Sequence, residues 1–225
     1  MGKAKGPQRN ASAGGAEPCR LFVVRHGTTT MNVQNRYRGR RDIPLDAQGY
    51  QDAVDAARRL SDAGLTAVYT GPLRRTIATA QIIADEARVP DIRILHGLVN
   101  LDYGDWEGMT VEEAEVFDPS AFMLYRTDPE QAICPSGERL RDATDRILQA
   151  MQLIGSRHQG EAVAAVSHAV MIRLAVARIR SVVGEAWRAP VGRGSLTGFT
   201  VAVDGTIALV HAPSGGIPDS APTSG

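Results

Sequence analysis

Short apolar runs alternate along this chain with segments of helical periodicity, and this alternation limits the possible folds more than any other feature. The run LFVV after Arg20 is rich in β-branched residues and ends at a charged, glycine-containing segment, as a buried parallel strand does. TAVY, IRIL and EAVAAVSH follow as further short strands, with amphipathic segments between them. Strands that alternate with helices predict an α/β fold, a three-layer sandwich with a mostly parallel central sheet flanked by helices.

Local signals predict the boundaries of these elements. Asp46 is a suitable N-cap for a helix that ends before Gly64, because aspartate favours helix starts and glycine favours helix ends. The stretch that leads up to Pro135 has no clear period and is expected to form an irregular lid. SLTGFTVAV and TIALVHA predict a hairpin around Asp204-Gly205. The remaining expected elements are strands at 20–24, 66–69, 92–95 and 161–168 and helices at 73–87, 110–117, 137–157 and 169–179.

The length of the chain is enough for one sizeable core, and no interdomain linker interrupts it. We predict a single domain over residues 19–212. The flanking segments 1–18 and 213–225 are poor in large apolar side chains. They are predicted to be disordered tails, because they cannot bury enough surface to offset the entropy cost of ordering.

Charge balance and the lack of long apolar runs exclude several functional classes. Lysine plus arginine and aspartate plus glutamate both number 25, so no net field attracts nucleic acid or an anionic membrane. No run reaches the roughly 18 apolar residues of a membrane span, and the N-terminus lacks the apolar segment of a signal peptide. We therefore expect a soluble cytoplasmic protein that binds neither nucleic acid nor membrane. Cys19 and Cys134 indicate neither a disulfide framework nor a zinc site.

Two of the predicted strands run into a histidine, His26 in one case and His168 in the other. A third junction, at 70–75, carries two arginines, Arg74 and Arg75. Because the carboxyl ends of parallel strands meet at one edge of a sheet, these side chains are expected to share a pocket. A guanidinium binds phosphate oxygens through two hydrogen bonds, and a neutral imidazole can attack phosphorus. The sequence therefore predicts a phosphate site.

Four blocks of the sequence, in order, resemble the histidine phosphatase (phosphoglycerate-mutase-like) superfamily, in its short phosphatase-type branch. RHGTTTMN resembles the signature RHG-x-[TS], with Asn32 at the family's asparagine position. YRGRRDIPLDAQG is similar to the segment QG…D-x-PL…x-G, GPLRRTIATA to SPL-x-RA-x-x-TA, and VSH to the strand that ends in the second histidine. RHG alone is a weak signal, but four ordered blocks over about residues 20–212 are a specific one.

The resemblance implies a role for each matching residue. It makes His26 the nucleophile, with Arg25, Arg75 and His168 around the phosphate. Supporting contacts to substrate or phosphate are implied for Gly27, Thr29, Asn32 and Gly39. No cofactor and no metal are implied, because the arginines and His168 supply the charge that a metal would. The arginine-rich loop with Arg36, Arg38, Arg40 and Arg41 could extend the phosphate site, although a solvated face is the more common fate of such a loop.

One position departs from the family pattern. The family places an acidic residue shortly before DYG-x-WEG as the general acid, and Asn100 stands there in LVNLDYGDWEG. An amide cannot give up a proton, though it can hydrogen-bond a substrate oxygen. General acid–base help contributes about 10²–10⁴-fold, so its loss is expected to slow cleavage rather than abolish binding. Asp102 is the first alternative donor, and Trp106 is expected to be a core residue.

The expected function is a phosphoric-monoester hydrolase that acts on a small-molecule phosphate ester through a phosphohistidine. A pseudoenzyme or trapped variant that binds a phosphorylated ligand is the alternative from another class, and Asn100, natural or engineered, favours it. A phosphoglycerate-mutase-type phosphotransferase is disfavoured by the short segment between Gly108 and Pro135. Another reaction that uses the amide at position 100 is the third option. Sugar phosphates, nucleotides and other phosphorylated metabolites all remain open as substrates, and so does the oligomeric state, with a homodimer as one option.

Overall fold

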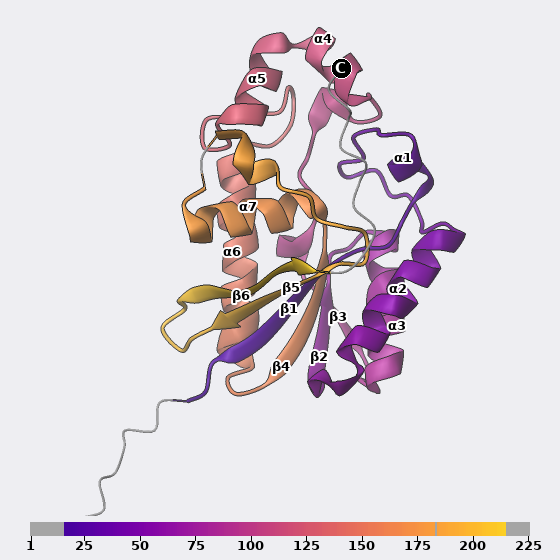
Figure 1. Ribbon diagram of the computed structural model, residues 1–225, viewed down its shortest axis with the longest axis vertical. Helices are drawn as coiled ribbons and strands as arrows, with labels where there is room; N and C mark the ends of the chain where they lie inside the picture. Colours follow the sequence, from indigo (N-terminus) through magenta and orange to yellow (C-terminus); the bar gives the residue numbers. More distant parts are fainter. Residues whose placement is uncertain (1–15, 183, 215–225) are drawn as a thin grey trace, which may run out of the picture.

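The computed structural model describes residues 16–182 and 184–214. Most of the two predicted tails therefore lies outside the described residues. A six-stranded sheet in the order β3-β2-β4-β1-β5-β6 forms the centre of the molecule (Figure 1). Strands β3, β2, β4 and β1 run parallel, and β5 and β6 are antiparallel. The strands are β1 (Cys19–Arg25), β2 (Leu65–Thr70), β3 (Ile92–Ile94), β4 (Ala162–Ser167), β5 (Leu196–Val201) and β6 (Ile207–Ser214).

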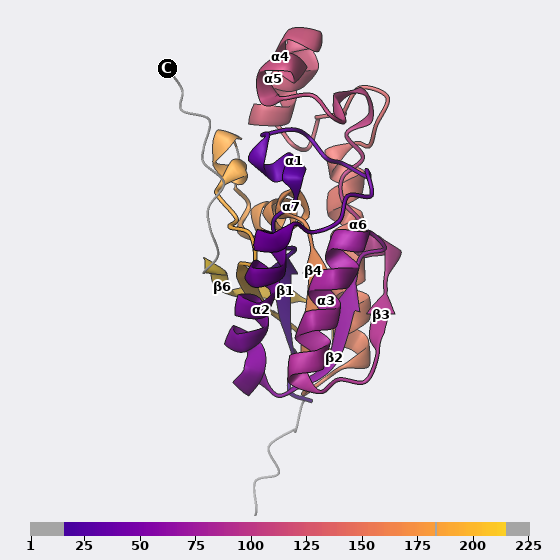
Figure 2. The same cartoon turned by 90° about the vertical axis from the view of Figure 1, so that its right-hand side faces the viewer.

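Helices cover both faces of this sheet, so the predicted three-layer α/β sandwich is confirmed. Helices α2 (Ala47–Leu60) and α3 (Arg74–Ala87) lie on one face, and α6 (Leu140–Arg157) and α7 (Ala169–Arg180) lie on the other (Figures 1 and 2). The remaining helices are α1 (Thr30–Val33), α4 (Val111–Phe117) and α5 (Pro119–Thr127), with short 3-10 turns at Ser61–Ala63, His96–Leu98, Gly104–Trp106 and Gly184–Arg188.

Alternation along β1 divides the core into two parts. Leu21 and Val23 pack on the side of α6 and α7, where Met151 also lies. Val24 points the other way, toward Ala57 of α2. Successive strand residues point to opposite faces, so a strand with helices on both sides is apolar along its whole length.

Helix α2 begins and ends where its capping residues predict. The Asp46 carboxylate accepts a hydrogen bond from the Gly49 backbone N–H at 2.8 Å. Gly64 closes the following 3-10 turn in the left-handed region, at φ +68°, which glycine adopts without steric cost.

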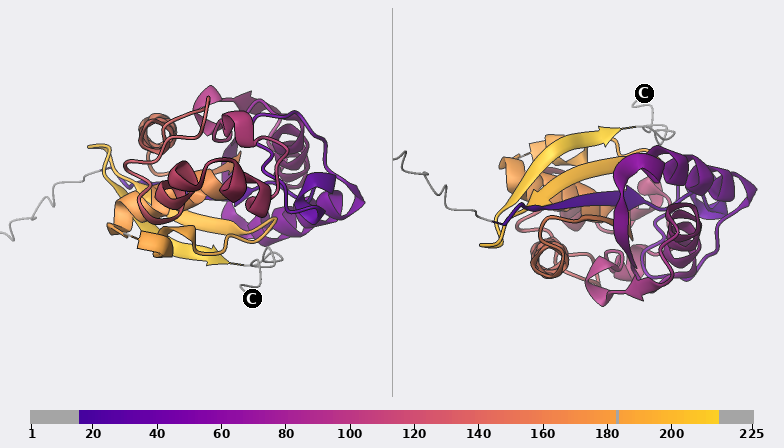
Figure 3. Two further views of the ribbon diagram at one scale, coloured as in Figure 1. Left: turned by 90° about the horizontal axis from the view of Figure 1, so that it is seen from above. Right: turned by 90° about the horizontal axis from the view of Figure 1, so that it is seen from below.

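The stretch before Pro135 differs from its prediction as an irregular lid, because it contains α5. Asp118 caps this helix by accepting from the Ala121 N–H at 3.0 Å, and Pro119 occupies its first turn. Phe122 and Tyr125, three residues apart, are its buried side chains. The capping residues and the spacing of the two aromatic side chains are both present in the sequence. The helix was not predicted because it is short and only one side of it is buried. Seen from above, α4 and α5 lie across the end of the molecule at which the parallel strands terminate (Figure 3).

Helix α6 begins at Leu140, three residues later than predicted. Gly137 packs so closely against the Asp102 carbonyl that a Cβ there would overlap it. This contact is made by a turn that comes before the helix, so the helix starts after it. No helix among residues 16–182 and 184–214 combines the length and the apolar character needed to cross a membrane.

Candidate active site

Adjacent strands bring two histidines together at the carboxyl edge of the sheet. Arg25 at the end of β1 is in register with Ser167 at the end of β4, and the next residue in each chain segment is a histidine. The ring centroids of His26 and His168 lie 5.1 Å apart with an interplanar angle of 64°. Both side chains are buried, with exposed fractions of 1% and 2%. The parallel pairing of β1 and β4 therefore determines the spacing of the two rings.

The surroundings of His26 keep its imidazole neutral and orient its ring. Its Nδ1 lies 2.6 Å from the Gly27 carbonyl, which can only accept, so we assign the proton to Nδ1 and the free lone pair to Nε2. Burial, followed by the charges of Arg75, Arg38 and Arg25, holds the pKa of His26 well below its ordinary value. The imidazole is therefore neutral near pH 7, the form that can attack phosphorus.

His168 is buried without a hydrogen-bond partner at either ring nitrogen. Its pKa is also held well below its ordinary value, by burial first and then by Arg75 and His26. A buried polar group left unpaired costs about 1–3 kcal/mol. Such a cost is offset when a ligand supplies the missing partner, so the unpartnered N–H of the neutral His168 ring is available to donate to an anion.

Arg75 and Arg74 have opposite environments at the start of α3. Arg75 is fully buried and donates from Nη2 to the Gly39 carbonyl at 2.9 Å and from Nη1 to the Arg41 carbonyl at 2.7 Å. Burial lowers the pKa of Arg75 to about 10 despite the raising effect of Asp42, so it remains a cation at pH 7. Arg74 is exposed, and only its backbone N–H is engaged, by the Asp42 carboxylate at 2.7 Å.

Arg25 is likewise fully buried at the end of β1. Its Nη1 donates to the Val191 carbonyl at 2.5 Å, which links the end of β1 to the segment that precedes β5. This contact positions the guanidinium within the electrostatic range of both histidines.

Asn100 lies beside the same backbone that Arg75 contacts. Its Nδ2 donates to the Gly39 carbonyl at 3.0 Å, while its Oδ1 is buried without a partner. The segment around it is held by Arg146 of α6, which donates to the carbonyls of Gly97 at 3.0 Å and Val99 at 2.9 Å. Sequence reasoning missed Arg146. The available signal was a cation within the apolar stripe of α6, between Ala143 and Ala150.

Three side chains of the arginine-rich loop pair with carboxylates at the surface, and the charge of the fourth acts on the two histidines. Arg36 pairs with Glu113 at 3.0 Å, Arg40 with Asp102 at 3.2 Å, and Arg41 with Glu107 at 3.9 Å. Arg38 is half-buried, and its charge lowers the pKa of both His26 and His168. The predicted solvated face therefore describes three of these side chains, whereas the charge of Arg38 acts on both histidines.

The turn after His26 is packed against the first turns of α2. The Thr28 backbone N–H and Oγ1 both donate to the buried Asp52 carboxylate, at 2.9 and 2.5 Å. A Cβ on Gly27 would overlap the Gly49 carbonyl, so only glycine allows this approach. Thr29 donates from its backbone N–H and from Oγ1 to Asn32 Oδ1, at 3.0 and 2.9 Å. These contacts hold the turn.

Asn32 and Gly39 complete the set of predicted residues. Asn32 Nδ2 is buried and has no partner, so one donor remains available for a ligand. Gly39 adopts a positive φ of +49°, and a Cβ there would overlap the Glu107 carboxylate. Its carbonyl receives both the Arg75 and the Asn100 hydrogen bonds. Within the described part of the chain, no hydrogen bond joins Thr29 or Asn32 directly to the two histidines.

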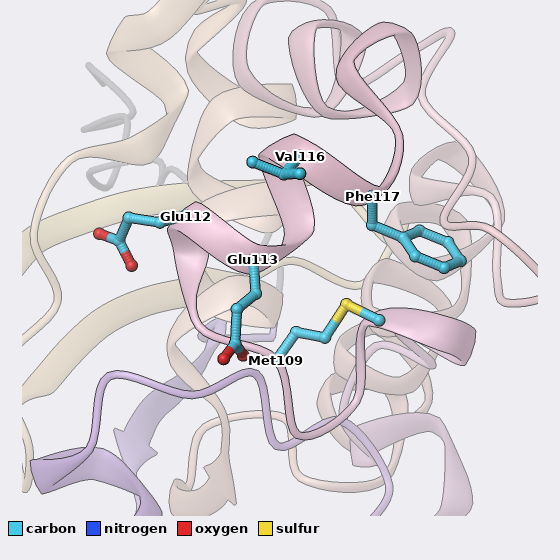
Figure 4. A pocket seen from close by; sticks show the side chains of 5 residues that line it. All are labelled: Met109, Glu112, Glu113, Val116 and Phe117. Carbon is cyan, nitrogen blue, oxygen red and sulfur yellow. The ribbon is translucent and has the colours of Figure 1, made fainter.

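A separate hollow of about 650 Å³ lies on α4. Figure 4 shows its lining, in which Glu112 and Phe117 point to opposite sides of the helix. The lining residues are Met109, Glu112, Glu113, Val116 and Phe117. None of them belongs to the histidine and arginine cluster. In the described part of the chain, no group of three or more histidine, cysteine, aspartate or glutamate side chains could hold a metal ion.

The fold and this cluster define an α/β protein with two neutral histidines among arginines at the carboxyl edge of a mostly parallel sheet. A family model described as histidine phosphatase superfamily (branch 1) matches residues 21–212. The chain belongs to this superfamily.

Similar proteins support the same assignment. Phosphoglycerate mutase-like protein 4 of Arabidopsis thaliana is 33% identical over 162 residues, which cover 71% of this chain and 70% of the relative. Phosphoserine phosphatase 1 of Hydrogenobacter thermophilus is 32% identical over 154 residues, 68% of this chain and 72% of the relative. The solved structure of Bacillus stearothermophilus YhfR superposes with a TM-score of 0.78 at 33% identity, covering 86% of this chain and 96% of that one.

Proposed function

We propose that the chain is a phosphatase that hydrolyses a small-molecule phosphate through a phosphohistidine at His26. The observation that carries this proposal is the pair of buried imidazoles, one with a free Nε2 lone pair and the other with both nitrogens unpartnered, surrounded by arginines. Similar proteins whose names describe phosphatases support the reaction class.

The first step transfers the phosphoryl group to the protein. Arg25, Arg75 and His168 hold the phosphate beside the His26 ring, and the guanidinium charges stabilise the charge that spreads over the phosphoryl oxygens. The Nε2–P bond forms as the bond from phosphorus to the leaving oxygen breaks. The Nδ1–H bond to the Gly27 carbonyl stabilises the positive charge that the ring gains.

The second step returns the histidine to its starting form. Water attacks the phosphohistidine, the N–P bond breaks, and its electron pair returns to Nε2. One hydrogen of the water stays on the phosphate product, and the other is released as a proton that balances the proton the departing group takes up from solvent. No cofactor takes part in either step.

Trapping the intermediate tests this proposal. The wild-type protein, mixed with p-nitrophenyl phosphate labelled with ³²P and quenched in base, should carry label on a histidine, whereas His26→Ala should carry none and should lose turnover. His211→Ala is the matched control, because His211 is exposed on β6, two strands away from β1 in the sheet; it should behave as the parent does. Label that persists in His26→Ala would refute the assignment of the nucleophile.

Asn100 supports a second candidate function, that of a binding protein. Such a protein would keep the phosphate-binding side chains but would not turn over a substrate. The observation in its favour is the missing proton donor beside an intact set of arginines. In that case vanadate or phosphate would raise the melting temperature of the wild-type protein, but neither label nor nitrophenolate would appear.

A further inference from the structure

We propose that the preferred substrate is a phosphoanhydride, in which the leaving group is itself a phosphate, such as the terminal phosphoryl group of a diphosphate. This inference rests on the phosphatase function proposed above and names its substrate class. It follows from two features of the described site, a missing acid and an additional cation.

Among the described residues around Asn100, no side chain is a suitable proton donor. Asn100 is an amide, and its Nδ2 already donates one hydrogen to the Gly39 carbonyl. The second N–H can stabilise an anion but cannot be transferred at neutral pH. His168 is neutral, and a neutral imidazole is a very weak acid.

The nearby carboxylates are all engaged elsewhere. Asp102 pairs with Arg40, and the Glu107 carboxylate accepts from the Arg40 backbone N–H at 2.6 Å. Asp42 accepts from the Arg74 N–H. The charge that acts most strongly on each of the two histidines is that of Arg75. Asp102 is therefore a poor substitute for the acid, contrary to its place as the first alternative in the sequence.

Arg38 supplies the additional cation. It precedes Gly39, the residue whose carbonyl joins Arg75 and Asn100, so its backbone lies on the side of the pocket where Asn100 stands. The family segment has glutamine at this position. Exchanging an acid for an amide and adding an arginine makes this side of the pocket suited to a negatively charged leaving group.

The identity of the leaving group decides whether an acid is needed. An alcohol leaves as a strongly basic alkoxide unless it is protonated in the transition state, and the acid contributes about 10²–10⁴-fold. A phosphate monoester, with a second pKa of about 6, leaves as a stable anion. In the proposed step the Nε2–P bond forms, the bridging P–O bond breaks, and its electron pair stays on the departing phosphate. Water then hydrolyses the phosphohistidine, with the proton released to solvent.

Adenosine 5′-diphosphate provides a test with an internal control. Its hydrolysis breaks an anhydride and yields adenosine monophosphate, whose own phosphate is an alkyl ester. We expect kcat/KM for the diphosphate and for inorganic pyrophosphate to exceed that for glycerol 3-phosphate by about 10²-fold or more. Adenosine monophosphate should accumulate without conversion to adenosine.

Two variants test the effects of the missing acid and of the additional cation separately. Asn100→Glu should raise glycerol 3-phosphate hydrolysis by about 10²-fold relative to p-nitrophenyl phosphate hydrolysis, because only the alkyl ester needs a proton donor. Arg38→Gln should lower kcat/KM for the diphosphate by about tenfold or more beyond any loss it causes with p-nitrophenyl phosphate, since one charge-assisted hydrogen bond contributes roughly 1.5–3 kcal/mol. Arg36→Gln, on the same loop but paired with Glu113, is the matched control and should leave both substrates unaffected.

The outcomes distinguish this inference from the proposed function. If p-nitrophenyl phosphate is cleaved but glycerol 3-phosphate is hydrolysed as fast as the diphosphate, the anhydride preference is wrong and the phosphatase function stands. If acetyl phosphate is strongly preferred over both pyrophosphate and the diphosphate, an acyl phosphate is the substrate class and the inference is overturned. If neither label nor nitrophenolate appears, the proposed function itself fails.

Discussion

At the scale of single residues, burial separates neighbours that look alike in the sequence. A helix rotates by about 100° per residue, so Arg74 and Arg75 cannot face the same way. Only Arg75 points inward, to the carbonyls of Gly39 and Arg41. Those two bonds hold its planar guanidinium in a fixed orientation, and the Nε atom, buried and without a partner, remains available for an anion.

Arg75→Ala should therefore weaken vanadate binding by about 10- to 100-fold, the loss expected for a hydrogen bond to a charged group worth roughly 1.5–3 kcal/mol. Arg74→Ala should bind as the parent does. The measurement is the vanadate concentration that raises the melting temperature half-maximally. Arg75→Lys, which keeps the charge, checks that the loss is not a folding defect. The reverse ranking of the Arg74 and Arg75 variants would show that the wrong arginine has been assigned.

Sequence reasoning placed two side chains of the candidate site together because topology determines their positions. His26 and His168 follow adjacent strands, and the carboxyl-edge rule places both at one pocket. The same rule could not place Arg38 and Arg146 near the site. A charged side chain on a loop or helix can face solvent or a neighbouring segment, and only the packing of segments distant in sequence decides between the two.

At the scale of elements, α2 supports the turn that carries His26 at the end of β1. Its first turns present the Gly49 carbonyl and the Asp52 carboxylate to residues 27 and 28. Capping and periodicity predicted this helix well, since Asp46 and Gly64 are local signals. Helix α5 was missed, because its two buried aromatic side chains span only one turn and most of its surface faces away from the core.

Replacing Asp52 tests this support. Asp52→Ala leaves the buried Thr28 N–H and hydroxyl without their acceptor, and should lower the free energy of unfolding by about 1–3 kcal/mol. It should also slow labelling of His26, because the turn that carries this residue loses its anchor. Asp55→Ala, on the exposed side of the same helix, is the control for loss of a carboxylate. Equal stability of the two variants, measured by urea denaturation, would contradict a supporting role for Asp52.

At the scale of the whole molecule, the site makes folding stability depend on pH. The formal net charge is zero at pH 7, so overall repulsion is small and individual buried groups decide the response. His26 and His168 are held neutral in the folded protein, with the pKa of each well below its ordinary value of about 6.5. In the unfolded chain both imidazoles titrate near that value. Below about pH 6.5 the unfolded state therefore binds more protons than the folded state.

Stability must then fall as the pH decreases, because the slope of the unfolding free energy with pH has the sign of the excess protons bound by the unfolded state. The stabilisation is fully present above pH 6.5 and is lost progressively toward the lower folded-state pKa, by at most about 1.4 kcal/mol per pH unit for each histidine.

Urea denaturation at pH 7.5, 6.5, 5.5 and 5.0 measures this slope. His26→Ala should reduce it, whereas His211→Ala should keep the parent slope because that side chain is exposed in the folded protein. A bound phosphate stabilises a protonated imidazole, so saturating phosphate should flatten the slope of the parent. A slope that is the same in the parent and in His26→Ala would show that His26 is not held neutral by its burial among the arginines.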